Sequence, residues 1–191
     1  MATTASPHGF RPVKLVGGQP YAGGLTSYKI ASGYATSIFT GDLVKPVTGG
    51  TVEKDTGTTA ATPLGVFMGC SYTDPNSGQV VHKPYWPAST VASDASALIA
   101  SDADLVLQIQ ADDTLAQTAL FANSALVQGT GSTITGMSGV SLDASLIEST
   151  ATLPVKIIGF VDSPTSAVGD TYTDVYVVLT THALRTALGL A

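Results

Sequence analysis

The sequence feature that most restricts the fold is a block of short apolar segments separated by turn residues. Residues 40–54 read TGDLVKPVTGGTVEK, and residues 63–69 read PLGVFMG. The Gly49-Gly50 pair supplies the positive φ angles that a tight hairpin turn requires. The apolar run that follows contains Gly65 and Gly69, which is typical of a central strand with a bulge. The block therefore predicts a β-hairpin followed by a third strand, at residues 43–47, 51–53 and 64–72.

Other segments of the chain also have the pattern of strands. Glutamate occurs only twice in the sequence, and the scarcity of Glu, Lys and Arg argues against a helical protein. Further strands are predicted at residues 27–31, 79–86, 103–111, 153–161 and 173–181. Residues 93–97 are predicted to be a loop, residues 115–127 fit either a loose helix or a break, and residues 129–136 fit a loop or an exposed hairpin. We predict an all-β fold: a compact β-barrel or β-sandwich formed by residues 36–191 as a single β-rich domain, with at most short helices.

The first 35 residues have a different composition from the rest and predict an extended N-terminal arm. Three prolines and six glycines disfavour a helix in this segment. Four aromatic residues are spaced along it, which a purely flexible linker would not need: Phe10, Tyr21, Tyr28 and Tyr34. Spaced aromatics suit an arm that docks onto a neighbouring molecule, and equally an ordered arm that packs on its own domain.

The charge of the chain is low and unevenly distributed. Charged residues make up 12% of the sequence and the net charge is −6. Residues 84–155 contain seven acidic residues and no Lys or Arg, so this region repels phosphate and nucleic-acid binding is not expected. A soluble monomer usually carries more surface charge, so we expect that a partner covers part of this surface, or that the protein self-associates.

The residue types that carry chemistry are sparse and scattered. Cys70 is the single cysteine and lies in an apolar run, so it is expected to be a small buried residue. The three histidines are far apart in sequence and lack zinc-ligand spacing. Gly136-Met137-Ser138-Gly139-Val140 fails the nucleophile-elbow pattern at its last position. The pairs Asp112-Asp113 and Asp102/Asp104 lack the partners of a glycosidase or calcium site. We therefore predict no enzyme activity, no metal and no cofactor.

The sequence also lacks signals for export or membrane insertion. The N-terminal residues do not form a signal peptide, and no apolar run reaches the ~18 residues of a membrane span. We expect synthesis in the cytoplasm, without membrane association.

The order of several short motifs resembles that of head decoration proteins, also called capsid cement proteins, of tailed bacteriophages. The block described above is similar to their core pattern G-D-L-V, G-G-x-V and P-L-G-V. Four further stretches look like parts of the same family: GFRP at residues 9–12, IASGYAT at 30–36, QIQAD at 108–112 and GTGST at 129–133. The similarity extends over most of the chain.

This resemblance implies a virion structural protein that decorates the outer capsid surface and stabilises the shell by bridging major capsid subunits. It also implies that the protein is made in the host cytoplasm and is present in many copies. It implies binding to the major capsid protein, a dimer or trimer at a symmetry axis, and no active site. In that case Phe10, Arg11, Tyr21 and Tyr28 of the arm are the candidate capsid contacts. Two alternatives remain: another virion β protein, from the tail or the fibre base, or a non-viral binding module or carbohydrate-active β domain.

Overall fold

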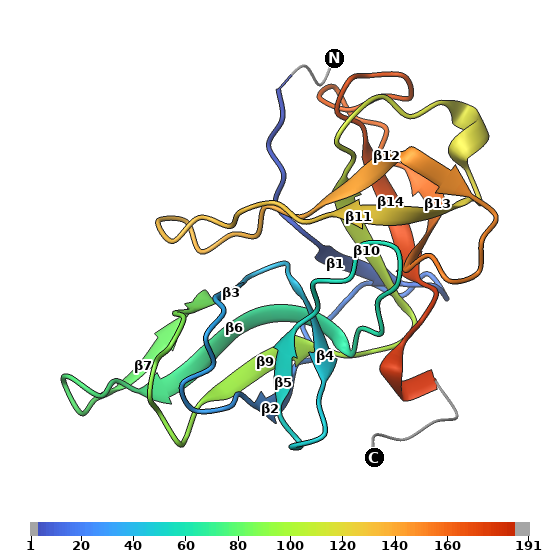
Figure 1. Cartoon of the computed structure of the whole chain (residues 1–191). Coiled ribbons are helices and arrows are strands. Elements are labelled where there is room, and N and C mark those ends of the chain that lie inside the picture. Colours follow the sequence, from blue (N-terminus) through green and yellow to red (C-terminus); the bar gives the residue numbers. More distant parts are fainter. Residues whose placement is uncertain (1–3, 186–191) are drawn as a thin grey trace.

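The computed structural model describes residues 4–185, and the first of its two six-stranded sheets is antiparallel (Figure 1). We call it the β10 sheet. In spatial order its strands are β1 (Arg11–Leu15), β10 (Leu105–Gln110), β14 (Asp174–Leu179), β13 (Val155–Phe160), β11 (Asn123–Val127) and β12 (Ser141–Glu148). All but one of these strands come from the second half of the chain. The N-terminal strand β1 completes one edge of the sheet.

The second sheet, which we call the β6 sheet, lies below the first in Figure 1. Its strands are β2 (Thr26–Lys29), β9 (Ser96–Ala100), β6 (Gly65–Thr73), β4 (Leu43–Pro46) and β5 (Val52–Lys54), with β7 (Val80–Lys83) paired to the far end of β6. A small pair, β3 (Ile38–Phe39) and β8 (Tyr85–Trp86), stands beside it. The described helical segments are two single 3₁₀ turns, η1 (Gln117–Ala119) and η2 (Ala183–Arg185). No described helix is long and apolar enough to cross a membrane.

The protein is therefore all-β, with 42% strand and 3% helix among the described residues, as the sequence predicted. The sheets are open and do not form a closed barrel, so the β-sandwich-like alternative is the one that fits. Leu43 and Val66 of the β6 sheet belong to the same buried cluster as Leu107 and Val177 of the β10 sheet. The two sheets thus share an apolar core where they meet.

The predicted strand block is present as β4, β5 and β6. Gly50 has a φ of +70° in the tight turn between β4 and β5, where a side chain would be strained. In β6 the register against β9 shifts between Phe67 and Gly69, and Gly69 has a φ of +142°. This irregularity is the predicted bulge, and it lets β6 pair with β9, β4 and β7.

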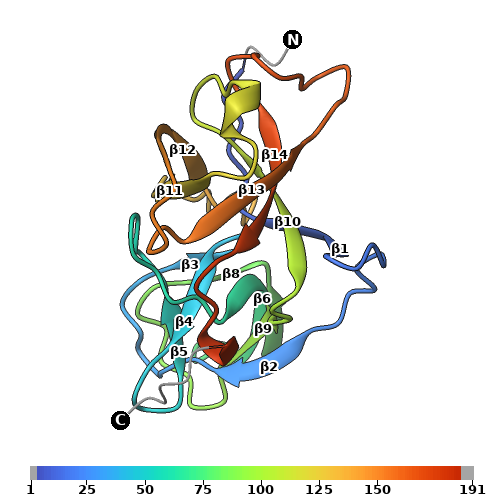
Figure 2. The ribbon, with the colours of Figure 1, turned by 90° about the vertical axis from the view of Figure 1, so that its right-hand side faces the viewer.

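The N-terminal segment is part of both sheets. β1 pairs with β10 and β2 pairs with β9, so residues 11–29 connect the edge of one sheet with the edge of the other (Figure 2). Of the two alternatives for the predicted arm, this arrangement agrees with an ordered arm that packs on its own domain. Residues 1–3 of the predicted arm and residues 186–191 of the predicted domain lie outside the described residues.

Some segments differ from the sequence prediction, and one ambiguous segment is resolved. The predicted loop at residues 93–97 overlaps β9, which is a strand in the middle of the β6 sheet. β1 and β12 were not predicted to be strands. The ambiguous segment 115–127 divides into η1 followed by β11, so its first part is a single helical turn and its last part is a strand.

Candidate interaction surface

The structure does not bring the four predicted contact residues together on one surface. Phe10 is 1% exposed and lies in the core of the β10 sheet, so its side chain is not part of the accessible surface. Arg11 is exposed on β1. Tyr21 is half-buried against the core of the β10 sheet, whereas Tyr28 is half-buried against that of the β6 sheet. The aromatic side chain at position 10 of the arm therefore packs in the protein's own core.

The candidate nucleophiles are used in packing and hydrogen bonding. Burial raises the pKa of the Cys70 thiol to about 12, which keeps it protonated at neutral pH. The Ser138 hydroxyl donates a hydrogen bond to the Asp42 carboxylate, at 2.6 Å, and accepts one from the Val140 amide. The described residues contain no group of three or more His, Cys, Asp or Glu side chains placed to hold a metal ion.

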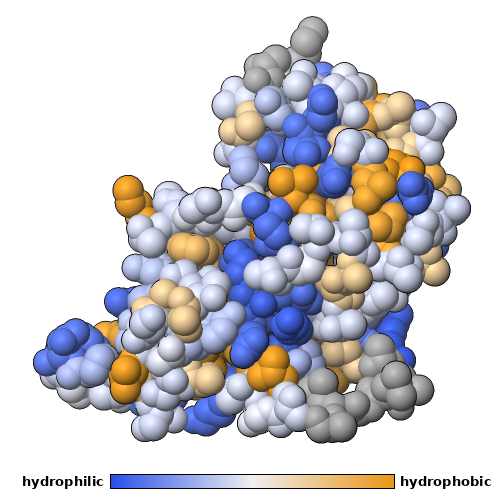
Figure 3. All heavy atoms as spheres, in the orientation of Figure 1, coloured by the Kyte–Doolittle hydropathy of each residue, from blue (hydrophilic) through white to orange (hydrophobic). Residues whose placement is uncertain are grey.

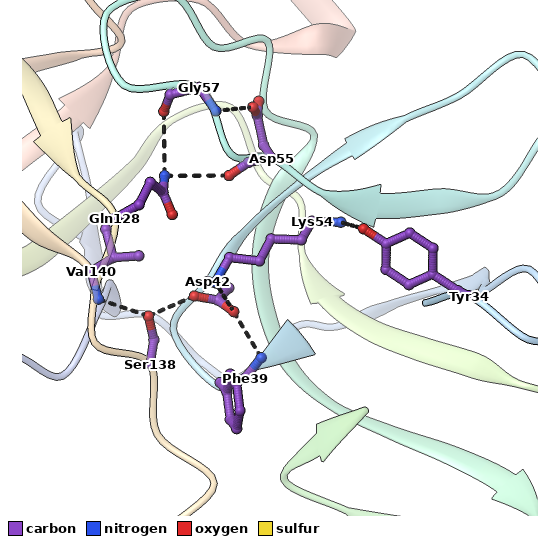
Figure 4. A network of polar contacts seen from close by, with 9 residues as sticks. All are labelled: Tyr34, Phe39, Asp42, Lys54, Asp55, Gly57, Gln128, Ser138 and Val140. Carbon is purple, nitrogen blue, oxygen red and sulfur yellow. Dashed lines mark hydrogen bonds and ion pairs between the residues drawn. The ribbon is translucent and has the colours of Figure 1, made fainter. Parts of the chain in front are cut away.

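The aspartate of the G-D-L-V motif is the centre of a buried polar network (Figure 4). Asp42 is fully buried, and its Oδ2 lies 3.0 Å from Lys54 Nζ and accepts the Phe39 amide at 2.8 Å. Its Oδ1 accepts the Ser138 hydroxyl. Asp42 immediately precedes β4 and Lys54 ends β5, both in the β6 sheet, but Ser138 belongs to the connection between β11 and β12. The carboxylate therefore joins this connection to the β6 sheet.

A second set of hydrogen bonds holds the start of the same connection. The Gln128 side-chain amide donates to the carbonyl oxygens of Asp55 and Gly57, at 3.5 and 3.3 Å. The Asp55 carboxylate in turn accepts the amides of Gly57 and Thr62. Figure 4 shows Gln128 facing this loop on one side of the network and Ser138 facing Asp42 on another.

The connection between β11 and β12, residues 128–140, forms a projecting hairpin that we call the 128–140 hairpin. Its two arms cross so closely that a Cβ on Gly129 would lie 1.9 Å from the carbonyl oxygen of Gly139. A Cβ on Gly131 would lie 2.3 Å from the Phe39 ring. Backbone hydrogen bonds from Thr40 to Gly136 and from Ser138 to Thr40 attach the hairpin beside β3. These contacts fix the direction in which the hairpin projects.

The tip of this hairpin carries an exposed hydrophobic side chain. Ile134 is 95% exposed, more than any other large hydrophobic residue in the described part of the chain. Figure 1 shows the hairpin extending away from both sheets on the left, and Figure 3 shows hydrophobic atoms at the end of this projection. Isolated surface hydrophobics are common in proteins, but this one stands on a firmly attached projection.

A second exposed hydrophobic residue lies in a strained turn at the other end of β11. Phe121 is 69% exposed and has a φ of +68°. A bulky residue in this left-handed region is an outlier, and such strain is often found at functional sites. The backbone there is held from both sides, because the Phe121 amide donates to the Ile157 carbonyl and the Ile157 amide donates to the Ala122 carbonyl.

Sequence reasoning identified neither Ile134 nor Phe121 as a surface residue of interest. The Gly/Thr composition of residues 129–136 gave an exposed hairpin as one possibility, and the structure agrees with that possibility. An isolated Ile in a segment rich in Gly, Ser and Thr is the signal that could have identified the tip. The strain at Phe121 left no signal in the sequence.

The stability of the protein is expected to decrease as the pH falls below about 6.5, the ordinary pKa of histidine. Burial, and next the charge of Arg185, lower the pKa of His182, which is 1% exposed. Burial, and next the charge of Arg11, lower the pKa of His8. In acid the unfolded chain then binds more protons than the folded chain, so the free energy of unfolding decreases as the pH falls.

Urea denaturation at pH 7.5 and at pH 5.5 tests this expectation. His182→Asn keeps an acceptor for the Leu184 amide, which the native Nδ1 accepts at 3.2 Å, but cannot be protonated. We expect this variant to lose less stability between the two pH values than the wild type. His82→Asn, at an exposed position on β7, is the matched control. An unchanged pH dependence in His182→Asn would contradict the assignment to His182.

Comparison of the chain with protein-family models, with curated proteins and with solved structures found no match.

Proposed function

We propose that this chain is a capsid decoration protein that binds the major capsid protein on the outer surface of a virion and stabilises the shell by bridging major capsid subunits. The observation that carries the proposal is the ordered set of motifs that resembles the phage decoration family. In the structure, the central motifs form β4, β5 and β6, and the aspartate of G-D-L-V supports the 128–140 hairpin. The motifs therefore belong to one connected unit that supports an exposed projection.

The physical properties of the surface suit this role. The chain has few charges, and several large hydrophobic residues are exposed on it, with Val80 and Val91 in addition to the two described above. A surface of this kind gains stability when a partner covers it. A decoration protein binds only the assembled lattice, so each bound copy shifts the equilibrium toward the assembled shell by mass action.

The binding strength required of one copy is modest. A standard interface of roughly 1,200–2,000 Å² per copy is enough, because the contacts are repeated over the whole lattice. We propose that the chain acts in the virion as a homo-oligomer, a dimer or a trimer, made in the host cytoplasm. The proposed role needs no catalysis, nucleic acid, membrane or cofactor.

The copy number of the chain in purified particles tests the proposal. Quantitative mass spectrometry of particles from the source gives the ratio of this chain to the major shell protein. A copy number comparable with that of the shell subunit is the expected result. A few copies per particle would instead indicate a tail or fibre-base protein, and absence from particles would overturn the virion role.

A further inference from the structure

The last described residues of the chain pass from one sheet to the other. Leu179, at the end of β14, belongs to the buried core of the β10 sheet, whereas Ala183 packs against the core of the β6 sheet. Figure 2 shows the chain leaving β14 and reaching η2 beside the β6 sheet. We call residues 181–185 the C-terminal clasp, because they hold the end of β14 against the other sheet.

Hydrogen bonds fix the clasp at both sheets. The Thr180 amide, just before the clasp, donates to the Pro154 carbonyl next to β13, at 3.0 Å. The Ala183 amide donates to the Pro63 carbonyl at 2.9 Å, in the segment that leads into β6. The two sheets also share a buried core to which no residue of the clasp belongs. The clasp can therefore open at Ala183 while both sheets stay folded.

The side chain at the centre of the clasp is the imidazole of His182, which is 1% exposed. Its Nδ1 accepts the Leu184 amide at 3.2 Å, so the neutral ring carries its proton on Nε2. Nε2 is buried and has no hydrogen-bond partner of normal geometry among the residues that the structure describes. A second proton would have to be placed on Nδ1, where it would face the N–H of Leu184. The closed clasp thus fits the neutral ring and not the charged one.

The surroundings of the ring also disfavour a positive charge. Burial, and next the charge of Arg185, lower the pKa of this imidazole, and the Leu64 backbone and Asp102 offset only part of the effect. The Arg185 guanidinium is itself paired with the carboxylate of Asp104. Residues 61–64, which accept hydrogen bonds from the clasp, contain no titratable side chain. The net effect is a site that holds the ring in its neutral form.

We propose that the C-terminal clasp is a proton-operated release: uptake of a proton by His182 opens residues 181–185 away from the β6 sheet. In the open form the ring lies in water and takes up a proton near its ordinary pKa of about 6.5, which the closed form does not allow. The population of the open form therefore grows by up to about tenfold between pH 7.5 and pH 5.5. This inference is independent of the proposed function, since it uses only contacts within the chain.

Hydrogen exchange of individual amides, followed by NMR in the full-length protein at low urea concentrations, tests the inference at pH 7.5 and pH 5.5. Dividing the intrinsic exchange rate by the observed rate at each pH gives a protection factor, which removes the pH dependence of the exchange chemistry itself. The Ala183 amide is expected to have a lower protection factor than the hydrogen-bonded amides of Phe67 and Ile157, one from each sheet, and a weaker dependence on urea. In acid the protection factor of Ala183 is expected to fall several-fold, up to about tenfold.

His182→Asn separates the proton from the packing of the clasp. Asparagine also offers an acceptor to the Leu184 amide but takes up no proton. In this variant we expect the local opening at Ala183 to be the same at both pH values. His82→Asn, at an exposed position on β7, is the matched control and is expected to keep the pH dependence of the wild type.

Three results would overturn the inference. Equal protection and equal urea dependence at Ala183, Phe67 and Ile157 would show that the clasp opens only when the whole protein unfolds. A local opening that does not grow in acid would show that protonation does not control it. The same growth in His182→Asn would assign the effect to another group. Because the first two comparisons use only the wild type, they hold even if the variant does not fold.

Discussion

Replacing Asp42 with asparagine is expected to lower the free energy of unfolding by about 3 kcal/mol, the lower end of the range for breaking a buried ion pair. The carboxylate is fully buried and holds Lys54, the Phe39 amide and the Ser138 hydroxyl. Without its charge, the Lys54 ammonium loses its partner where water has little access. The lower end of this energy range applies because the Lys54 side chain remains 10% exposed to water.

Chemical denaturation of the variant, the wild type and a control measures this difference. The matched control is Asp104→Asn, which breaks the exposed ion pair between Asp104 and Arg185, whose side chains are 60% and 54% exposed. Surface pairs of this kind contribute about 0–1 kcal/mol, so the control is expected to be nearly neutral. If Asp42→Asn lowers the free energy of unfolding by no more than Asp104→Asn does, the buried network around Asp42 does not stabilise the fold as inferred.

Replacing both charged partners provides a second check. Asp42→Leu combined with Lys54→Met removes the ion pair without leaving an unpaired charge, so part of the lost stability is expected to return. The Ser138 hydroxyl and the Phe39 amide still lose their acceptor. Faster hydrogen exchange at the amides of the 128–140 hairpin is therefore expected even where the overall stability recovers.

Replacing Gly9 with alanine is expected to lower the free energy of unfolding by at least about 3 kcal/mol, from left-handed backbone strain and overpacking together. Gly9 has a φ of +69°, and a Cβ there would lie 2.5 Å from the Gly41 carbonyl oxygen and 2.6 Å from the Ser138 Cβ. This oxygen is a backbone atom of the G-D-L-V segment that leads into β4, so it cannot move independently. This position therefore leaves no room for a side chain.

Gly23→Ala is the control that separates the two causes. Gly23 has a similar φ of +79°, but nothing lies within 4 Å of the position that its Cβ would occupy. The strain alone is expected to cost about 1–2 kcal/mol there. Equal losses in the two variants, measured by thermal and chemical denaturation, would show that packing around Gly9 contributes nothing.

The sequence was sufficient to predict the parts of the fold that depend on local turn chemistry and strong apolar patterns. The Gly49-Gly50 turn and the bulge at Gly69 were predicted because a positive φ restricts the residue type. β9 was missed because its sequence, Ser-Ala-Leu-Ile-Ala, is dominated by small residues and has no clear alternation. It is a strand because β2 and β6 pair with it on both sides, and this environment is not encoded in its own residues.

The candidate surface was less predictable than the fold. The arm was expected to make contacts because it contains aromatics, but Phe10 completes a core whose other members are distant in sequence. The buried role of Asp42 depends on Lys54 and Ser138, and Ser138 is 96 residues away. Long-range partners of this kind have no periodic signal in a single sequence.

The placement of β1 also determines when the protein can fold. β1 pairs with β10, so β1 has no partner strand until residues 105–110 have left the ribosome. β14 then completes the centre of the same sheet close to the end of the described chain. Such high contact order implies slow folding, on the order of milliseconds to seconds, with a large loop closed before the strands pair. A truncated chain that lacks β14 is therefore expected to leave both β1 and Phe10 without a folded partner, so this sheet becomes stable only after β14 has been made.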